Sequence, residues 1–256
     1  MPSIPFAKAS ACGNDFLVID ISHAGANVAE LTRRLCDRHN GVGADGVEWL
    51  VPAKEADIEA RLINADGSEA ELSGNGTRCV AACIAEHGGS ETIRVLTGAG
   101  VKTCELIARR GTNFEFKTAM GKPEISGEVA VNGMRGLKVS TGNPHFVVMV
   151  DEFAQGWQAA ADGAARTSHF PKGTNVEFVN VRDRHHIDVR LYERGVGETQ
   201  SSGTGSCASA VAAIHTGHCD SPVQVTTLGG TQTVAWDGEI TLTGPATIVC
   251  TGQFFI

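Results

Sequence analysis

The chain lacks a long apolar run, an excess of positive charge and an N-terminal leader pattern. No stretch approaches the roughly 18 consecutive apolar residues that a membrane-spanning helix needs. Acidic residues outnumber Lys and Arg by 29 to 21, giving a formal net charge of −8, which argues against a nucleic-acid partner or an anionic membrane surface. The opening MPSIPFAKAS has neither the basic segment nor the apolar core of a secretory signal. We therefore expect a cytoplasmic protein with no nucleic-acid partner and no membrane partner.

Disulfide and metal chemistry are also not expected. The eight cysteines are scattered over a chain without export signals, so reduced, buried thiols are the simplest interpretation. Cys79 and Cys83 would share one face of a helix, but no histidine stands at a spacing that would complete a metal site. The adjacent His185 and His186 are typical of a solvated strand segment.

Common motifs for phosphate binding, dinucleotide binding and ester hydrolysis are either absent or stand in the wrong sequence context. GVGADG at 41–46 matches G-x-G-x-x-G, but CDRHN precedes it rather than an apolar strand. The chain has no Walker A sequence. Neither Ser73 nor Ser202 lies in a G-x-S-x-G nucleophile elbow, so a Ser–His hydrolase built on Ser73 and His145 has little support.

The chain instead contains an internal repeat. ELSGNGTRCVAACIAEHG at 71–88 is echoed by QSSGTGSCASAVAAIHTG at 200–217, and Ser202 follows Ser73 by 129 positions. The same offset of 129 relates Glu198 to Glu69, and it relates GNPHFVVMVD, which begins at Gly142, to GNDFLVID, which begins at Gly13. Three separated blocks at one offset predict two copies of one structural unit, and hence two similar domains that face each other.

Each copy has the same predicted order of elements. A Gly-Asn turn leads into a β-rich run, and later a strand with alternating polarity, DIEARLIN or HIDVRLYE, precedes the Ser-Gly turn. The alanine-rich run after that turn predicts a central helix ending near Gly88 or Gly217. We expect an α/β (α+β) fold of two pseudo-symmetric domains, each a mixed β-sheet wrapped around a central helix. The expected domains are residues 1–115 with a returning C-terminal strand at about 247–256, and residues 116–246, linked around 113–122.

The two Ser-Gly turns have two competing interpretations. Serine is a preferred N-cap residue, so Ser73 and Ser202 could serve only to begin their helices. Two helix N-termini, with unpaired N–H groups and partial positive charge, would also bind a carboxylate or phosphate. The duplication, together with the Asn and Glu residues near both copies, favours a ligand site.

Several longer blocks carry a family resemblance. The segments GNDFLVID, CDRHNGVGADG, NADGSEAELSGNGTRC, STGNPHFVVMV, TNVEFV and ERGVGETQSSGTGSC closely resemble the blocks of diaminopimelate epimerases, in order and over most of the chain. The resemblance implies two pseudo-symmetric α/β domains that close on a small-molecule amino-acid substrate. It also implies inversion of one α-carbon, from LL- to meso-diaminopimelate on the route to lysine, with no cofactor: no pyridoxal phosphate and no metal. Some relatives are homodimers.

The resemblance also implies roles for individual residues. Ser73 and Ser202 would stand at the two acid/base positions, with His145 as the partner of the first and Glu193 as the partner of the second. Substrate-binding side chains would come from Asn14, Asn64, Asn143, Asn175, Glu193 and Arg194. Backbone donors would come from Gly74, Asn75, Gly203 and Thr204.

The chain departs from the family at both acid/base positions, where the family has cysteine. A serine hydroxyl is far less acidic than a thiol and needs a partnered base to accept a proton, so we expect turnover to suffer more than binding. Cys79 and Cys207 align with non-catalytic cysteines. Cys12, beside Asn14, is expected to be buried without a catalytic role, and Gly46 stands where some members carry a ligand-contacting glutamine.

Three hypotheses remain open at this stage. The first is a diaminopimelate epimerase with serines at both base positions. The second is a related racemase or isomerase acting on the more acidic carbon of another small acid. The third is a non-catalytic amino-acid-binding homologue. Turnover of diaminopimelate, turnover of another acid, or tight binding without proton exchange would separate the three.

Overall fold

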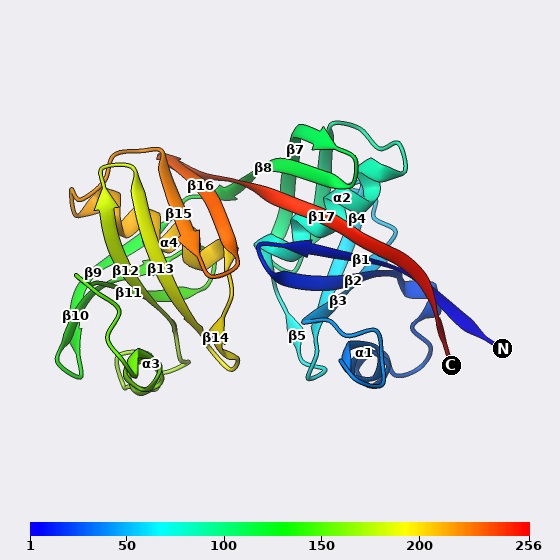
Figure 1. The fold of residues 1–256 in the computed structure, drawn as a ribbon, viewed down its shortest axis with the longest axis horizontal. Helices are drawn as coiled ribbons and strands as arrows, with labels where there is room; N and C mark the ends of the chain where they lie inside the picture. The colour runs from blue at the N-terminus through cyan, green and yellow to red at the C-terminus, as the bar shows by residue number, and fades with distance from the viewer. The chain divides into compact units, whose positions relative to one another are not determined.

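The computed structural model describes residues 1–256 and divides into two compact units (Figure 1). Unit 1 comprises Met1–Thr118 and Gly244–Ile256, and unit 2 comprises Ala119–Thr243. The expected α+β fold class, with a mixed sheet and a central helix in each repeat, is confirmed. The expected link at 113–122 lies almost entirely within one continuous strand, β8. No helix is long and apolar enough to cross a membrane.

In unit 1, a ring of strands surrounds helix α2 (Figure 1). The strands pair in the order β17–β1–β2–β3–β4–β6–β7–β8, and β8 pairs with β17 again. The pairs β2–β3 and β4–β6 are parallel, which makes the sheet mixed. The elements are β1 (Ser3–Ala11), β2 (Asn14–Asp20), η1 (Ile21–His23), α1 (Val28–Cys36), β3 (Gly46–Val51), β4 (Ile58–Asn64), β5 (Glu69–Ala70), α2 (Gly74–Glu86), β6 (Thr92–Thr97), β7 (Gly100–Arg110), β8 (Asn113–Gly121) and the C-terminal part of β17 (Glu239–Phe255).

In unit 2, strands likewise pack around a central helix, α4. Its strands pair in the order β9–β10–β11–β12–β13–β15–β16–β17, and β11–β12 and β13–β15 are the parallel pairs. The elements are β9 (Glu124–Val131), β10 (Met134–Ser140), β11 (Pro144–Met149), α3 (Trp157–Ala165), β12 (Asn175–Asp183), β13 (His186–Glu193), β14 (Gly197–Thr199), α4 (Gly203–His215), β15 (Val223–Thr227) and β16 (Gly230–Asp237).

The strands of each unit present two different faces. Because successive side chains on a strand point to opposite faces, Phe16 and Val18 of β2 pack in the cluster around α2, whereas Leu17 and Ile19 pack in the cluster beneath α1. In unit 2, Val147 of β11 packs in the cluster around α4 and the neighbouring phenylalanine, Phe146, in the cluster beneath α3. The strands beneath α1 and α3 are therefore buried on both sides, whereas strands such as β8 and β15 alternate buried and exposed side chains.

Helices α1 and α3 were not predicted from the sequence. Helix α1 begins at Asn27, whose Oδ1 accepts a hydrogen bond from the Glu30 N–H at 3.1 Å, and it buries Leu35 and Cys36 on one side. Both features are ordinary signs of an amphipathic helix. Helix α3 begins at a left-handed glycine, Gly156, without a side-chain cap, so its start carries no such signal.

Burial on all sides explains the alanine content of α2 and α4. Ala81 and Ala82 of α2 are fully buried, as are Ala208, Ala210 and Ala212 of α4. A helix enclosed by strands has no solvent face, and small side chains let the surrounding strands approach its axis.

Arg78 joins the first turns of α2 to the returning strand β17. Its side chain is fully buried. Its Nη1 donates to the Gly74 carbonyl at 3.0 Å, its Nη2 to Asn75 Oδ1 at 2.7 Å and its Nε to the Pro245 carbonyl at 3.3 Å. Pro245 belongs to the segment that returns from unit 2, so this side chain ties the C-terminal segment to the helix that begins at Ser73.

Replacing Arg78 tests how much its side chain contributes to the stability of the fold. We expect Arg78→Met to lower the free energy of unfolding by about 3 kcal/mol, because three buried oxygen acceptors lose their donors. Arg94→Met, at an exposed position on β6, is the matched control and should change stability by less than about 0.5 kcal/mol. Chemical denaturation measures both, and equal stability of the two variants would contradict this role for Arg78.

Candidate functional site

Each unit carries a serine at the N-terminus of its central helix, as the cap interpretation predicts. Ser73 Oγ accepts a hydrogen bond from the Gly76 N–H at 3.0 Å, and Ser202 Oγ accepts one from the Gly205 N–H at 3.2 Å. Both serines have extended backbone angles, as an N-cap residue does. Ser73 is half-buried and Ser202 is 9% exposed. Both hydroxyls therefore stand where the helix backbone favours negative charge.

A buried glutamate lies beside each of these helix N-termini. Glu48 is on β3 and Glu177 on β12, and Glu177 follows Glu48 by the repeat offset of 129. A Cβ placed on Gly76 would stand 1.9 Å from Glu48 Oε1 and 3.2 Å from Ser73 Cβ. A Cβ on Gly205 would stand 3.0 Å from Glu177 Oε1 and 3.2 Å from the Cβ of Ser202. In both units the carboxyl and the serine are therefore neighbours across a glycine.

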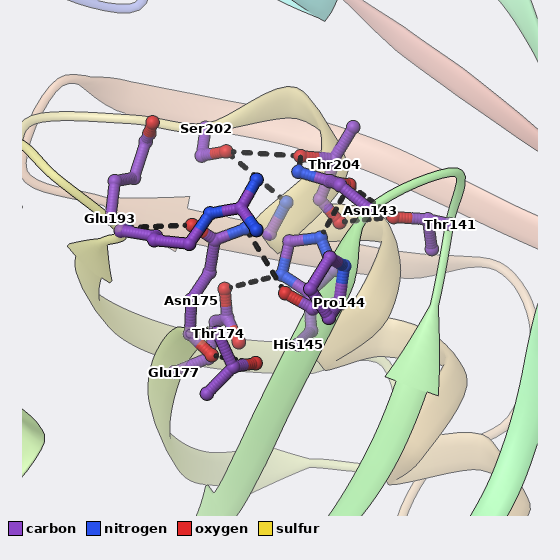
Figure 2. A network of polar contacts seen from close by, with 12 residues as sticks. Thr141, Asn143, Pro144, His145, Thr174, Asn175, Glu177, Glu193, Ser202 and Thr204 are labelled. Carbon is purple, nitrogen blue, oxygen red and sulfur yellow. Dashed lines mark hydrogen bonds and ion pairs between the residues drawn. The ribbon is translucent and has the colours of Figure 1, made fainter. Parts of the chain in front are cut away.

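In unit 2, a polar network connects the glutamate to the helix (Figure 2). His145 Nδ1 lies 2.7 Å from Glu177 Oε1, and its Nε2 lies 2.9 Å from Asn143 Oδ1. Asn143 Nδ2 donates to Thr204 Oγ1 at 3.3 Å, and Thr204 Oγ1 lies 3.4 Å from the Ser202 hydroxyl. One continuous chain of contacts thus runs from β12 through β11 to the first turn of α4.

The His145–Glu177 pair is enclosed by protein. Both side chains are essentially inaccessible to solvent, and Glu177 Oε2 has no hydrogen-bond partner. Burial raises the pKa of the Glu177 carboxyl, while the charge and hydrogen bond of His145 lower it. Both ring nitrogens of His145 are engaged within unit 2, so its assignment as the partner of Ser73 stays a prediction.

Glu193 lies at the end of β13 on the side of Ser202 (Figure 2). Its side chain is half-buried, and Oε1 accepts a hydrogen bond from Thr199 Oγ1 at 3.1 Å. Burial raises the pKa of this carboxyl, and the hydroxyl donors Thr199 and Ser202 lower it. The effect of the Ser202 hydroxyl on the pKa of Glu193 is consistent with the predicted association of these two residues.

Asn175 positions the segment that follows Glu193. Its Oδ1 accepts the Arg194 N–H at 2.9 Å, and its Nδ2 donates to the Pro144 carbonyl at 3.2 Å. The Arg194 side chain is exposed, with Nη1 donating to the Lys172 carbonyl at 3.0 Å. Asn175 thus holds the backbone at Arg194 against the strand that carries His145.

The predicted site residues of unit 1 make separate contacts. Asn14 Nδ2 donates to Asp45 Oδ2 at 2.5 Å, and Asn64 Nδ2 donates to Ser68 Oγ at 3.0 Å. Asn75 is 1% exposed and its amide oxygen is held by Arg78, so its predicted contribution rests on the backbone N–H. Gly46 is buried at the start of β3.

No cysteine replaces the missing thiols in this structure. Cys79 is fully buried, and burial raises its thiol pKa well above the usual range. Cys207 is also fully buried. Cys12 is buried in a left-handed turn, with φ of 52°. No group of three or more His, Cys, Asp or Glu side chains is placed to hold a metal ion.

Sequence reasoning missed Glu48 and Glu177 as members of the two half-sites. Their signal was the repeat itself, because Glu48 in GVEWLV and Glu177 in NVEFV occupy equivalent positions inside otherwise apolar strands. Thr141 and Thr199 were also missed. Thr141 Oγ1 donates to the Thr204 carbonyl at 3.4 Å, and no sequence pattern distinguishes either threonine from an ordinary strand residue.

The chain matches a family model described as diaminopimelate epimerase over residues 6–126 and 137–249. A diaminopimelate epimerase of Pelotomaculum thermopropionicum is 37% identical over 274 residues, covering 97% of this chain and 98% of that protein. One from Rippkaea orientalis is 38% identical, covering 98% and 99%.

Solved structures of lower identity share the fold. A hydroxyproline epimerase from Agrobacterium vitis gives a TM-score of 0.75 at 15% identity, covering 99% of this chain and 91% of that one. A PhzF-family phenazine biosynthesis protein from Bacillus anthracis gives 0.75 at 16% identity, covering the whole of both chains. The family resemblance inferred from the sequence blocks is confirmed by these matches: the chain belongs to the diaminopimelate epimerase family of isomerases.

Proposed function

We propose that this protein is a cofactor-independent epimerase that converts LL-diaminopimelate to meso-diaminopimelate. One half-site takes a proton from the α-carbon, and the other returns a proton to the opposite face. The observation that carries the proposal is that family similarity covers nearly the whole chain. It is supported by Ser73 and Ser202, the proposed acid/base residues, each capping the N-terminus of a central helix.

The helix N-termini suit the chemistry of α-proton removal. Negative charge develops on the substrate carboxylate as the C–H bond breaks, and preoriented backbone N–H groups stabilise that charge. In this proposal the backbone donors are Gly74, Asn75, Gly203 and Thr204. The polar groups of the substrate are bound by Asn14, Asn64, Asn143, Asn175, Glu193 and Arg194.

In the proposed reaction each serine needs a second group that accepts its hydroxyl proton. A serine hydroxyl accepts a carbon-bound proton only if a second group removes the hydroxyl proton. In this proposal Glu193 does this for Ser202, which is supported by the Ser202 hydroxyl being one of the donors that lower the pKa of the Glu193 carboxyl. The family resemblance implies the same role for His145 toward Ser73, and both ring nitrogens of His145 are engaged with Glu177 and Asn143 in this structure.

The proposal also covers the partners, the location and the oligomeric state of the protein. The substrate is a small amino acid, and the net charge of −8 supports independence from nucleic acid. Eight free cysteines support a reducing, cytoplasmic location. A homodimer is included as a proposal and is tested by measuring the mass in solution.

A second candidate function is isomerisation of another small acid with a more acidic carbon. The presence of serine at both acid/base positions favours it, because a weaker base is sufficient to remove a proton from a more acidic carbon. Turnover of such an acid without turnover of diaminopimelate would select this alternative.

Restoring thiols at both positions tests the main proposal. We expect the Ser73→Cys, Ser202→Cys variant to exchange the α-proton of diaminopimelate in D2O at least about 100-fold faster than the unchanged protein, because a thiolate accepts the proton without a relay. NMR of the LL and meso isomers measures the exchange. The matched Ser73→Ala, Ser202→Ala variant should bind substrate and show no exchange. Absence of exchange in both the serine and cysteine proteins, with the fold intact, would refute the epimerase proposal.

Glu193 should control the half-reaction of Ser202. We expect Glu193→Gln to lower kcat by about 100-fold or more, because the amide cannot take up the serine proton. The ligand Kd should rise as well, because Glu193 is also one of the proposed substrate-binding residues. The raised pKa of Glu193 places the acidic limb of the kcat profile above the ordinary glutamate value of 4.5, and activity rises as pH increases through it. Glu198→Gln, at an exposed neighbour bonded only by Gln158, is the control. An unchanged kcat in Glu193→Gln would contradict this role.

A further inference from the structure

The two half-sites differ in their ionisable groups. The repeat offset places Asn64 in unit 1 where unit 2 has Glu193, and Phe16 where unit 2 has His145. Both substitutions replace a group that can carry a proton with one that cannot. Ser73 therefore lacks, within its own unit, the two titratable neighbours that accompany Ser202.

One buried carboxyl remains on the α2 side of unit 1. Asp15, the other buried acid of the unit, is bound by Lys8 at 2.9 Å and by Arg38 at 2.7 Å. Glu48 is 3% exposed, and none of the ion pairs of the structure includes it. Strand alternation turns its side chain toward α2, since its neighbours Val47 and Trp49 pack beneath α1.

The first turn of α2 is shaped around this carboxyl. Glu48 Oε1 occupies the space that a side chain at Gly76 would fill, since a Cβ there would stand 1.9 Å away. Ser73 Cβ lies 3.2 Å from the same point. The Ser73 hydroxyl accepts the Gly76 N–H, so a rotation about its Cα–Cβ bond, or one bridging water, is needed to bring its proton to the carboxylate.

Burial alone raises the pKa of Glu48, and no charged group shifts it. Its neighbours across the two strand ladders are Val18 and Leu62. The titratable groups that α2 brings to this interior are Arg78, which is held by three oxygen acceptors, and the thiols of Cys79 and Cys83, whose raised pKa values keep them neutral. Burial raises the pKa of Glu48 to about 8, which is close to the pH at which a general base is most effective.

We propose that Glu48 is the ionisable group of the first half-site and that Ser73 relays protons between it and the substrate. In the forward step the substrate Cα–H bond breaks and its proton forms the new Ser73 O–H bond. The original Ser73 proton passes to the Glu48 carboxylate, and the electron pair moves into the substrate carboxylate. In the reverse step protonated Glu48 returns its proton to Ser73 as Ser73 protonates the carbanion. This inference rests on the proposed epimerase function.

A double-mutant cycle tests the relay. In the unchanged protein we expect Glu48→Gln to lower the exchange rate about 100-fold and to remove the rise in rate with pH that is centred near 8. In a Ser73→Cys background the same change should cost less than about threefold, because a thiolate needs no relay. Gln has the shape of the protonated acid, so the fold should persist at pH 7. Glu69→Gln, at an exposed position of unit 1, is the control and should change neither rate.

The outcomes of the double-mutant cycle distinguish a proton relay through Glu48 from a structural role of this residue. A large loss with serine and a small loss with cysteine would support it, and the cysteine result would also show that the glutamine variant folds. Equal losses in both backgrounds would assign Glu48 a structural role and overturn the relay. An unchanged rate in Glu48→Gln would overturn it as well. Absence of exchange in every protein, including the one with cysteine at both positions, would instead refute the epimerase function, and the relay with it.

Discussion

Each unit of this protein buries a carboxyl against the N-terminus of a helix that has no solvent face, and much of the local structure follows from that placement. The position next to the carboxyl is glycine in both units, and at Gly76 a side chain would collide with Glu48. The cap residue is a serine, whose short side chain satisfies an N–H group without filling the space beside it. The helix behind the cap is alanine-rich because strands surround it.

The two units satisfy this constraint in different ways. In unit 2, His145 contacts Glu177 and connects it to Asn143 and the first turn of α4. In unit 1 a phenylalanine, Phe16, takes the place of the histidine, and burial in apolar surroundings keeps the Glu48 carboxyl neutral near pH 7. The repeat therefore keeps a buried carboxyl at the same position in both units but gives it different neighbours. Such a difference suits a reaction in which one half-site removes a proton and the other returns one.

The repeat made most of this architecture predictable from the sequence. A constant offset places equivalent residues at equivalent points of two similar folds, so the caps at Ser73 and Ser202 and the central helices followed directly from it. Helix α3 did not, because it begins at the uncapped Gly156. The location of the Glu48 side chain was also not predicted, since the structure is needed to show which face of β3 lies against α2. The contact between Arg78 and the carbonyl of Pro245 was also not predictable, because the two residues are 167 positions apart in the sequence.

The most direct test of the central claim is a 13C NMR titration of glutamate side-chain carboxyl carbons, with the Glu48 signal assigned by its loss in Glu48→Gln. We expect a midpoint near the pKa of about 8 that burial gives Glu48, well above the ordinary glutamate value of 4.5. A midpoint at 4.5 would show that the carboxyl is charged at neutral pH and that Glu48 is not a base poised near neutral pH.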